Sequence, residues 1–149
     1  EGIQQSLTDT SWPGRFEIIG DSLVLDGEHN EAYAQALCAA WKETFPKESA
    51  QLIFGAAESK DLDGIFRAIL PIIASVTFVP IRSERRLSGE EMSKAFIDAG
   101  GDPQKVDSVA SLEEALAKVG GRQLVAGSLF LVGEAKSILD GGEFEVSLQ

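Results

Sequence analysis

Short apolar runs alternate along the chain with longer segments in which apolar residues recur every three to four positions. Runs of about four or five apolar residues are typical of buried strands, and the periodic segments are typical of amphipathic helices. Their alternation predicts parallel βαβ units with helices on both faces of the sheet. We therefore expect a three-layer α/β domain with a mostly parallel sheet of about five or six strands. The expected strands are Arg15–Ile19, Leu23–Asp26, Gln51–Gly55, Ser75–Val79 and Gln123–Ala126.

Start and stop signals mark the expected helices. The segment Glu31–Phe45 carries one apolar stripe, Asn30 can cap its first turn, and Pro46 follows its end. Ser88 and Ser111 each stand three residues before a glutamate, which is a capping-box pattern, and a Gly-Gly pair stops both of these helices. Two further helices are expected, one over Asp61–Leu70, which Pro71 ends, and one over Ser128–Leu139. A short final strand is expected over Glu143–Leu148.

Composition and charge narrow the possible partners. The 149 residues fit one domain, residues 1–149, in which residues 1–10 have the character of a linker. With 24 acidic and 13 basic side chains, the formal charge of −11 argues against binding to duplex nucleic acid or to an anionic membrane. No uncharged stretch approaches the roughly 20 apolar residues that span a bilayer. Because Cys38 is the single cysteine, no internal disulfide can form, and we expect a cytoplasmic protein.

The densest group of polar residues, Asp26-Gly27-Glu28-His29-Asn30, lies between an expected strand and the clearest expected helix. Ligands of open α/β sheets collect at the carboxyl ends of strands, and helix N-termini attract phosphate. Asp26 could accept hydrogen bonds from sugar hydroxyls, and His29 could donate one. The alternative interpretation is that Asp26 and Asn30 only cap the helix and that His29 lies on the surface.

Other candidates stand beside expected strands. Arg15 follows a Pro-Gly turn that could aim its guanidinium at a phosphate or carboxylate, although a purely structural turn remains an alternative. Lys60 and Ser128 follow strand ends, and Ser128 has the spacing of an N-cap. Arg82 opens a small basic cluster that could also simply offset the acidic surface. One histidine and one cysteine argue against a His/Cys zinc site.

Several nucleotide and nucleophile motifs are absent from the sequence. There is no G-x-x-x-x-G-K-[ST] loop and no G-x-G-x-x-G after a strand, so this chain by itself lacks the usual phosphate cradles. Ser128 does not stand in a G-x-S-x-G elbow. The initial residue is Glu1, not methionine, which leads us to expect a piece of a longer protein.

Four motifs occur in a specific order along the chain. They are Trp12 to Glu17, Leu25 to Asn30, Gly55 to Asp61 and Gly127 to Glu134. Together they resemble the C-terminal domain of folylpolyglutamate synthase and dihydrofolate synthase, in the Mur ligase superfamily. The resemblance runs from Ser11 to Ala135. It implies a Rossmann-like domain of a two-domain, ATP-dependent ligase that adds L-glutamate to a folate or dihydropteroate carboxylate through an acyl phosphate.

The resemblance also implies that the chain works with a larger N-terminal domain, which carries the P-loop and holds most of the ATP and Mg²⁺. Alone, the C-terminal domain would be inactive, and no catalytic residue is expected in it. By position, Asp26 resembles the family's ribose-binding aspartate, His29 the histidine beside the nucleotide, and Arg15 the arginine directed at the ATP phosphates. The glutamate site would draw on Ser128, Lys60 and Arg82.

The chain departs from the family pattern at three positions, where Glu28, Glu31 and Ser59 replace the usual alanine, proline and aspartate. Glu28 adds a negative charge near a polyanion. Two alternatives stand beside the folate ligase. One is a Mur-type amino-acid ligase of cell-wall precursor synthesis, and the other, kept open by Glu28, is a non-catalytic interaction module on the same fold.

Overall fold

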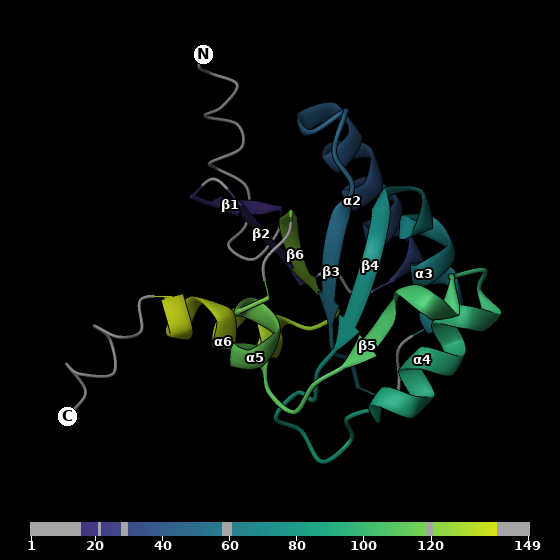
Figure 1. The fold of residues 1–149 in the computed structure, drawn as a ribbon, viewed down its shortest axis with the longest axis vertical. Helices are drawn as coiled ribbons and strands as arrows, with labels where there is room; N and C mark the ends of the chain where they lie inside the picture. The colour runs from purple at the N-terminus through teal and green to yellow at the C-terminus, as the bar shows by residue number, and fades with distance from the viewer. Residues whose placement is uncertain (1–15, 21, 28–29, 58–60, 119–120, 140–149) are drawn as a thin grey trace.

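The computed structural model describes residues 16–20, 22–27, 30–57, 61–118 and 121–139. Within these residues, six strands form one sheet in the order β1-β2-β6-β3-β4-β5 (Figure 1). β1 pairs antiparallel with β2, and all other neighbours are parallel, so the expected mostly parallel sheet is confirmed. The strands are β1 Glu17–Ile19, β2 Leu23–Asp26, β3 Ala50–Phe54, β4 Ile73–Phe78, β5 Val106–Ser108 and β6 Arg122–Ala126.

Helices cover the sheet on both faces. In the described part of the chain, three α-helices pack against one face, and two others lie together on the opposite face, on the left of Figure 1. The first group is α2 Glu31–Thr44, α3 Leu62–Ile69 and α4 Gly89–Asp98, and the second is α5 Leu112–Leu116 and α6 Leu129–Leu139. The result is the expected three-layer α/β fold.

The capping residues work as the sequence predicts. Asn30 accepts a hydrogen bond from the Tyr33 backbone N–H at the start of α2. At the start of α4, Ser88 and Glu91 form the full capping box, in which each side chain accepts a hydrogen bond from the backbone N–H of the other residue. Such caps satisfy donors that the first helical turn leaves open. The helix starts are therefore fixed by local chemistry.

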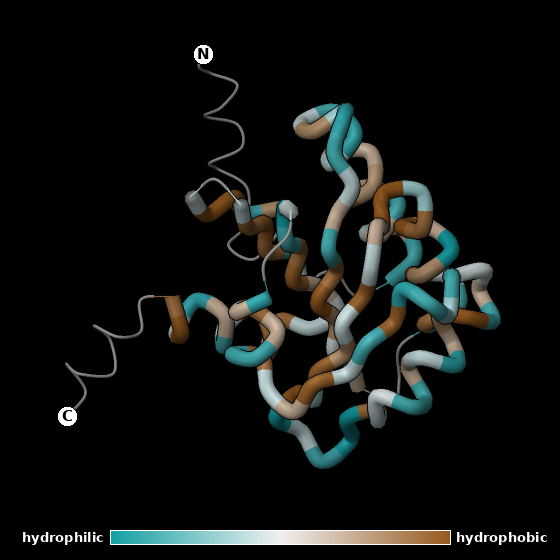
Figure 2. Tube along the Cα trace, viewed as in Figure 1, coloured by the Kyte–Doolittle hydropathy of each residue, from teal (hydrophilic) through white to brown (hydrophobic). Residues whose placement is uncertain are grey.

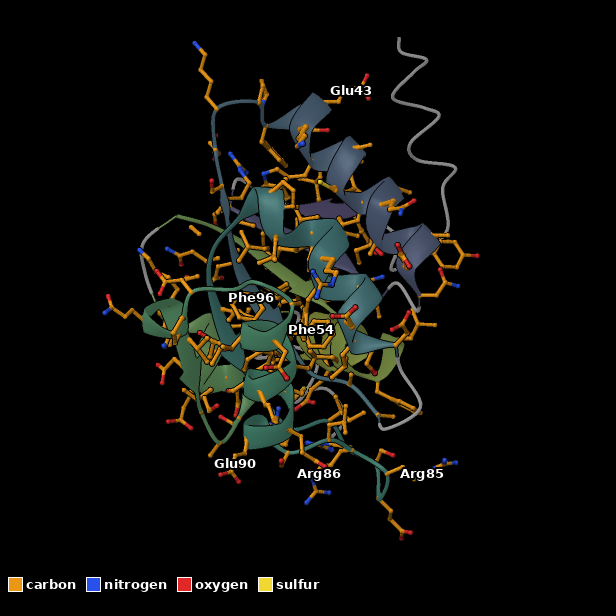
Figure 3. All side chains as sticks on the ribbon, turned by 90° about the vertical axis from the view of Figure 1, so that its right-hand side faces the viewer. Glu43, Phe54, Arg85, Arg86, Glu90 and Phe96 are labelled. Carbon is orange, nitrogen blue, oxygen red and sulfur yellow. The ribbon has the colours of Figure 1, made fainter. Side chains whose placement is uncertain are left out.

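Aromatic side chains fill the layer between the sheet and α2–α4. The rings of Phe54 and Phe66 have centroids 4.8 Å apart, and Phe66 meets Phe96 edge to face at 5.4 Å. Trp41 is fully buried in the same layer. Figure 2 shows the hydrophobic positions along the strands, and Figure 3 shows Phe54 and Phe96 inside the molecule. Packing of this kind holds the strand ends at fixed places.

Three sequence expectations differ from the structure. The edge strand β5 (Val106–Ser108) was not expected, because two of its three residues are exposed and it lacks an apolar run. α5 ends at Leu116, not at the following Gly-Gly pair, since the Gln123 side-chain amide donates to carbonyls at its end. Pro71 lies within a 3₁₀ turn that follows α3. The expected final strand and the linker of residues 1–10 lie outside the described residues.

Candidate functional site

A topological switch point lies between the carboxyl ends of β2 and β6. The two strands are parallel neighbours, yet β2 leads into α2 on one face of the sheet and β6 leads into α6 on the other (Figure 1). Diverging connections of this kind open a crevice in which α/β proteins bind ligands. The expected Asp26 and Ser128 both belong to this edge.

Asp26 is the last residue of β2 and pairs in register with Ala126 of β6. Only 5% of Asp26 is exposed, and Gly27 after it is also buried. Its place at the end of a buried strand fixes the position of the carboxylate. A carboxylate held in this way is an acceptor suited to hydroxyl donors at the carboxyl edge of the sheet.

Ser128 lies two residues beyond Ala126, where β6 leads into α6. It is 5% exposed, and its Oγ accepts a hydrogen bond from the Phe130 backbone N–H at 3.0 Å. The Val132 N–H bonds to the Ser128 carbonyl at 3.1 Å. Ser128 therefore acts as the capping residue that its spacing predicts. Because its hydroxyl accepts in this bond, the hydroxyl hydrogen can still be donated to a ligand.

Glycines allow the loops at this edge to approach one another. A Cβ on Gly27 would lie 2.6 Å from Leu129 Cδ2 and 3.1 Å from Leu129 Cα. Gly127 has a φ of +108°, and a Cβ there would lie 2.5 Å from the Gly55 carbonyl oxygen. Such distances exclude a side chain at either glycine without movement of a neighbour. The ends of β2, β3 and β6 thus form one closely packed unit.

The loop after β4 from Arg82 to Arg86, called the basic loop below, carries three arginines and lies along the same edge of the sheet. The Leu87 N–H donates to the Ala56 carbonyl at 2.9 Å, and Arg86 forms a β-bridge with Ala57, just after β3. Figure 3 shows Arg85 and Arg86 at the end of the molecule opposite Glu43, which lies near the C-terminus of α2. Positive charge of an acidic protein is therefore placed beside the end of β3.

The remaining expected site residues have different outcomes. Arg82 follows β4, two strands away from β6, and its guanidinium lies 3.8 Å from the Glu134 carboxylate, with 84% of its side chain exposed. The structure thus pairs Arg82 with α6 rather than with Ser128. Arg15, His29 and Lys60 lie outside the described residues, as do Glu28 and Ser59.

Within the described part of the chain, no group of three or more His, Cys, Asp or Glu side chains could hold a metal ion. In the same part of the chain, no helix is both long and apolar enough to cross a membrane. Cys38 lies on the buried side of α2, where burial raises the pKa of its thiol despite the opposing charge of Lys42.

Residues 14–133 match the family described as Mur ligase, glutamate ligase domain. The chain belongs to this family. The glutamate ligase domain is 34% identical over 144 residues to a probable bifunctional folylpolyglutamate synthase/dihydropteroate synthase of Haloferax volcanii, covering 92% of the chain and 17% of that protein. It is 28% identical over 147 residues to folylpolyglutamate synthase of Lacticaseibacillus casei, covering 96% of the chain and 33% of that protein.

Solved structures agree with this assignment. Folylpolyglutamate synthase from Thermotoga maritima superposes with a TM-score of 0.80 at 28% identity, over 94% of the chain and 33% of that protein. Folylpolyglutamate synthase from Mycobacterium tuberculosis, complexed with ADP and AMPPCP, gives a TM-score of 0.75 at 27% identity, over 88% of the chain and 33% of that protein. The glutamate ligase domain thus spans no more than about a third of the relatives it matches.

Sequence reasoning placed Asp26 and Ser128 at strand ends but missed how closely their loops pack. The structure packs Gly27 against Leu129, a contact that joins the loops after β2 and β6. A glycine directly after each of β2, β3 and β6 is the available signal, because close backbone approaches need residues without a Cβ. The contact between the basic loop and the end of β3 had no signal in the sequence.

Proposed function

We propose that this domain is the C-terminal part of an ATP-dependent ligase that adds L-glutamate to a folate or dihydropteroate carboxylate. The observation that carries the proposal is the switch point between β2 and β6, which brings Asp26 and Ser128 to one edge in a chain of the glutamate ligase family. The names of the relatives support the folate branch over a cell-wall ligase. Since the chain spans a third or less of these relatives, the remaining domain would supply the P-loop and hold most of the nucleotide.

The reaction has two steps. The acceptor carboxylate attacks the γ-phosphorus of ATP, which forms an acyl phosphate and releases ADP. The amine of glutamate then attacks the acyl carbon, so that an amide bond forms, inorganic phosphate leaves and the nitrogen loses a proton. Mg²⁺ bound by the remaining domain would offset charge on the phosphates. Catalysis of this kind depends mainly on orientation and on stabilising developing charge.

The residues of this domain would bind and orient. Asp26 accepts hydrogen bonds from the ribose hydroxyls, and the basic loop after β4 adds positive charge near the phosphates. The free hydroxyl hydrogen of Ser128 is donated to a carboxylate of the incoming glutamate. Arg82 could join that site once it leaves Glu134, a movement made easier because exposed pairs of this kind contribute little stability.

The three expected residues outside the described part of the chain belong to the same proposal. Arg15 would reach toward the ATP phosphates, His29 would lie beside the nucleotide, and Lys60 would contribute to the glutamate site. Each is assigned by its position in the family motifs. Their contributions can be measured with the same assays as those of Asp26 and Ser128.

The test uses the full-length enzyme that contains this domain, with dihydropteroate or a reduced folate as acceptor and glutamate-dependent ADP release as readout. Asp26→Ala should raise the KM for ATP about 10- to 100-fold, because a charge-assisted hydrogen bond contributes about 1.5–3 kcal/mol. Ser128→Ala should instead raise the KM for glutamate. The matched control Asp98→Ala removes an exposed carboxylate on α4 and should leave both constants unchanged.

Three outcomes would contradict the proposal. Unchanged constants in both site variants, with intact thermal unfolding, would remove Asp26 and Ser128 from the site. No glutamate-dependent ADP release by the wild-type enzyme with either acceptor would favour the non-catalytic module. Activity with a cell-wall precursor alone would favour the other ligase class.

A further inference from the structure

Polar side chains gather on the face of the sheet where α5 and α6 lie. Parallel sheets are usually apolar on both faces, because helices bury both of them. Here the strand registers place Gln51 of β3 between Gln123 of β6 and Ser75 of β4, and Thr77 of β4 beside Asp107 of β5. The alternate residues of the same strands fill the core on the other face. The five polar side chains therefore share one face of the sheet.

A hollow of about 400 Å³ lies over these five side chains, and all of them line it. Because α5 is only five residues long, it leaves this part of the sheet face open. The Gln123 amide donates to the carbonyls of Ala115 and Lys118, two further lining residues, at 3.4 and 3.1 Å. These bonds fix the end of α5 as one wall of the hollow. Its volume is within the range of about 300–1,000 Å³ that is typical of small-molecule sites.

Thr77 on the floor of the hollow points to a ligand. Only 7% of the residue is exposed, yet its hydroxyl takes part in none of the hydrogen bonds that the described residues form. Buried hydroxyl groups in proteins are nearly always hydrogen-bonded, because leaving one without a partner costs free energy. A buried hydroxyl that faces a hollow and has no partner in the described chain is thus available to a bound molecule.

The charged side chains around the hollow favour an anion. Lys105 and Lys118 supply two positive charges, and Asp107, which pairs with Lys118, supplies one negative charge. The lining therefore carries a net positive charge, although the whole chain carries −11. In the described part of the chain, Lys105 has no ion-pair partner. Its ammonium group can donate charge-assisted hydrogen bonds to a carboxylate.

We propose that this hollow binds a small organic acid that carries a hydroxyl group beside its carboxylate. The carboxylate would meet the Lys105 ammonium. The hydroxyl group of the acid would bond to Thr77 and Gln51, whose side chains offer both donors and acceptors. None of the described residues that line the hollow belongs to the candidate site, since Asp26 ends β2 and Ser128 follows β6. The binding site is therefore independent of the proposed function.

The test measures the binding of L-malate and citrate, two hydroxy acids, to the full-length protein by isothermal titration calorimetry. Both acids should bind at millimolar concentration or below, and erythritol, a neutral polyol, should not. Thr77→Val keeps the shape of the side chain and removes its hydroxyl, so it should weaken binding about 2- to 10-fold, the usual effect of one hydrogen bond. Thr77→Ser keeps a hydroxyl and should bind better than Thr77→Val. Lys105→Gln should weaken binding by about 10-fold, because hydrogen bonds from charged groups are stronger.

Lys94→Gln is the matched control, because Lys94 is an exposed lysine of α4 on the opposite face of the sheet. This variant should bind both acids as the wild type does. Without acid, Thr77→Val should unfold at the same temperature as the wild type or at a higher one, since it removes a buried hydroxyl that has no partner.

Three results would overturn the inference. If neither acid binds the wild type at millimolar concentration, the hollow is not a site for this class of molecule. Unchanged affinity in both Thr77→Val and Lys105→Gln would place the bound acid elsewhere on the protein. Equal weakening in Lys94→Gln and Lys105→Gln would show a general effect of charge rather than a contact in the hollow.

Discussion

Substitution of Gly127 by alanine tests whether the junction between β6 and α6 is as closely packed as the structure indicates. Gly127 has a φ of +108°, which L-residues rarely adopt. An added Cβ would lie 2.5 Å from the Gly55 carbonyl oxygen and 2.9 Å from the Phe54 ring. Both obstacles are parts of the buried core, so neither can move away freely.

The expected loss of stability follows from the strain of the positive φ and from the overpacking around the added Cβ. A residue forced into a sparsely populated backbone region costs about 1–3 kcal/mol. Overpacking of a well-packed core costs about 1–3 kcal/mol more. We therefore expect Gly127→Ala to lower the free energy of unfolding by about 2–6 kcal/mol, which is a large part of the 5–15 kcal/mol that is typical of a domain.

Urea unfolding followed by far-UV circular dichroism measures the effect. With an m-value of about 2 kcal/mol/M, a loss of about 4 kcal/mol moves the midpoint down by about 2 M. Gly133→Ala provides the matched control, because Gly133 lies within α6 and an added Cβ would meet nothing within 4 Å. Removing a helix-interior glycine should stabilise the domain by about 0.5–1 kcal/mol.

The two glycines should therefore respond in opposite directions. If Gly127→Ala unfolds within about 0.5 kcal/mol of the wild type, the junction is not closely packed and the reasoning fails. If both variants lose stability equally, the cause is a general effect on α6 and not the clash at Gly127.

Three further predictions concern other parts of the domain. Gly27→Ala should raise the KM for both ATP and glutamate in the full-length enzyme, because the added Cβ would lie 2.6 Å from Leu129 Cδ2. Adding Leu129→Ala should restore part of the loss, and no rescue would show that this contact does not couple the two loops. The hydrogen bond from Lys118 holds the pKa of Asp107 below its ordinary value of 3.8, so its stabilisation is present above that value and is lost as the pH falls through the lowered pKa. In unfolding experiments from pH 6 to pH 2, Asp107→Asn should remove the part of the free energy of unfolding that is lost as this carboxylate is protonated. That part is well under about 1 kcal/mol because the pair is exposed, and an unchanged pH profile would contradict the prediction. Burial raises the pKa of the Cys38 thiol, so a thiol reagent should modify Cys38 much more slowly in the native protein than in urea, and equal rates would show that the thiol is accessible.

Local signals in the sequence were enough to predict most of the elements. Asn30 and Ser88 cap helices through side-chain hydrogen bonds with residues three positions away, so the information is contained in short segments. The strand at Leu23–Asp26 is a short apolar run that ends at its predicted residue. β5 was missed because its pairing with β4, rather than its own residues, makes it a strand.

The candidate site was predictable only in part. Asp26 and Ser128 could be singled out because each follows a strand and precedes a helix, which places them at the carboxyl edge of a parallel sheet. That β2 and β6 are neighbours is a result of chain topology, because the chain forms β3, β4 and β5 before it returns to place β6 between β2 and β3. The pairing of Arg82 with Glu134 likewise joins segments far apart in sequence.

The sequence by itself determined the fold class, the helix starts and the residue types present at the candidate site. These depend on hydrophobic periodicity and on hydrogen bonds between residues a few positions apart. Only the tertiary structure decided that β6 lies between β2 and β3, that Gly27 packs against Leu129, and that α6 turns Phe130 outward. Those features depend on how distant segments share one core, and no single segment carries that information.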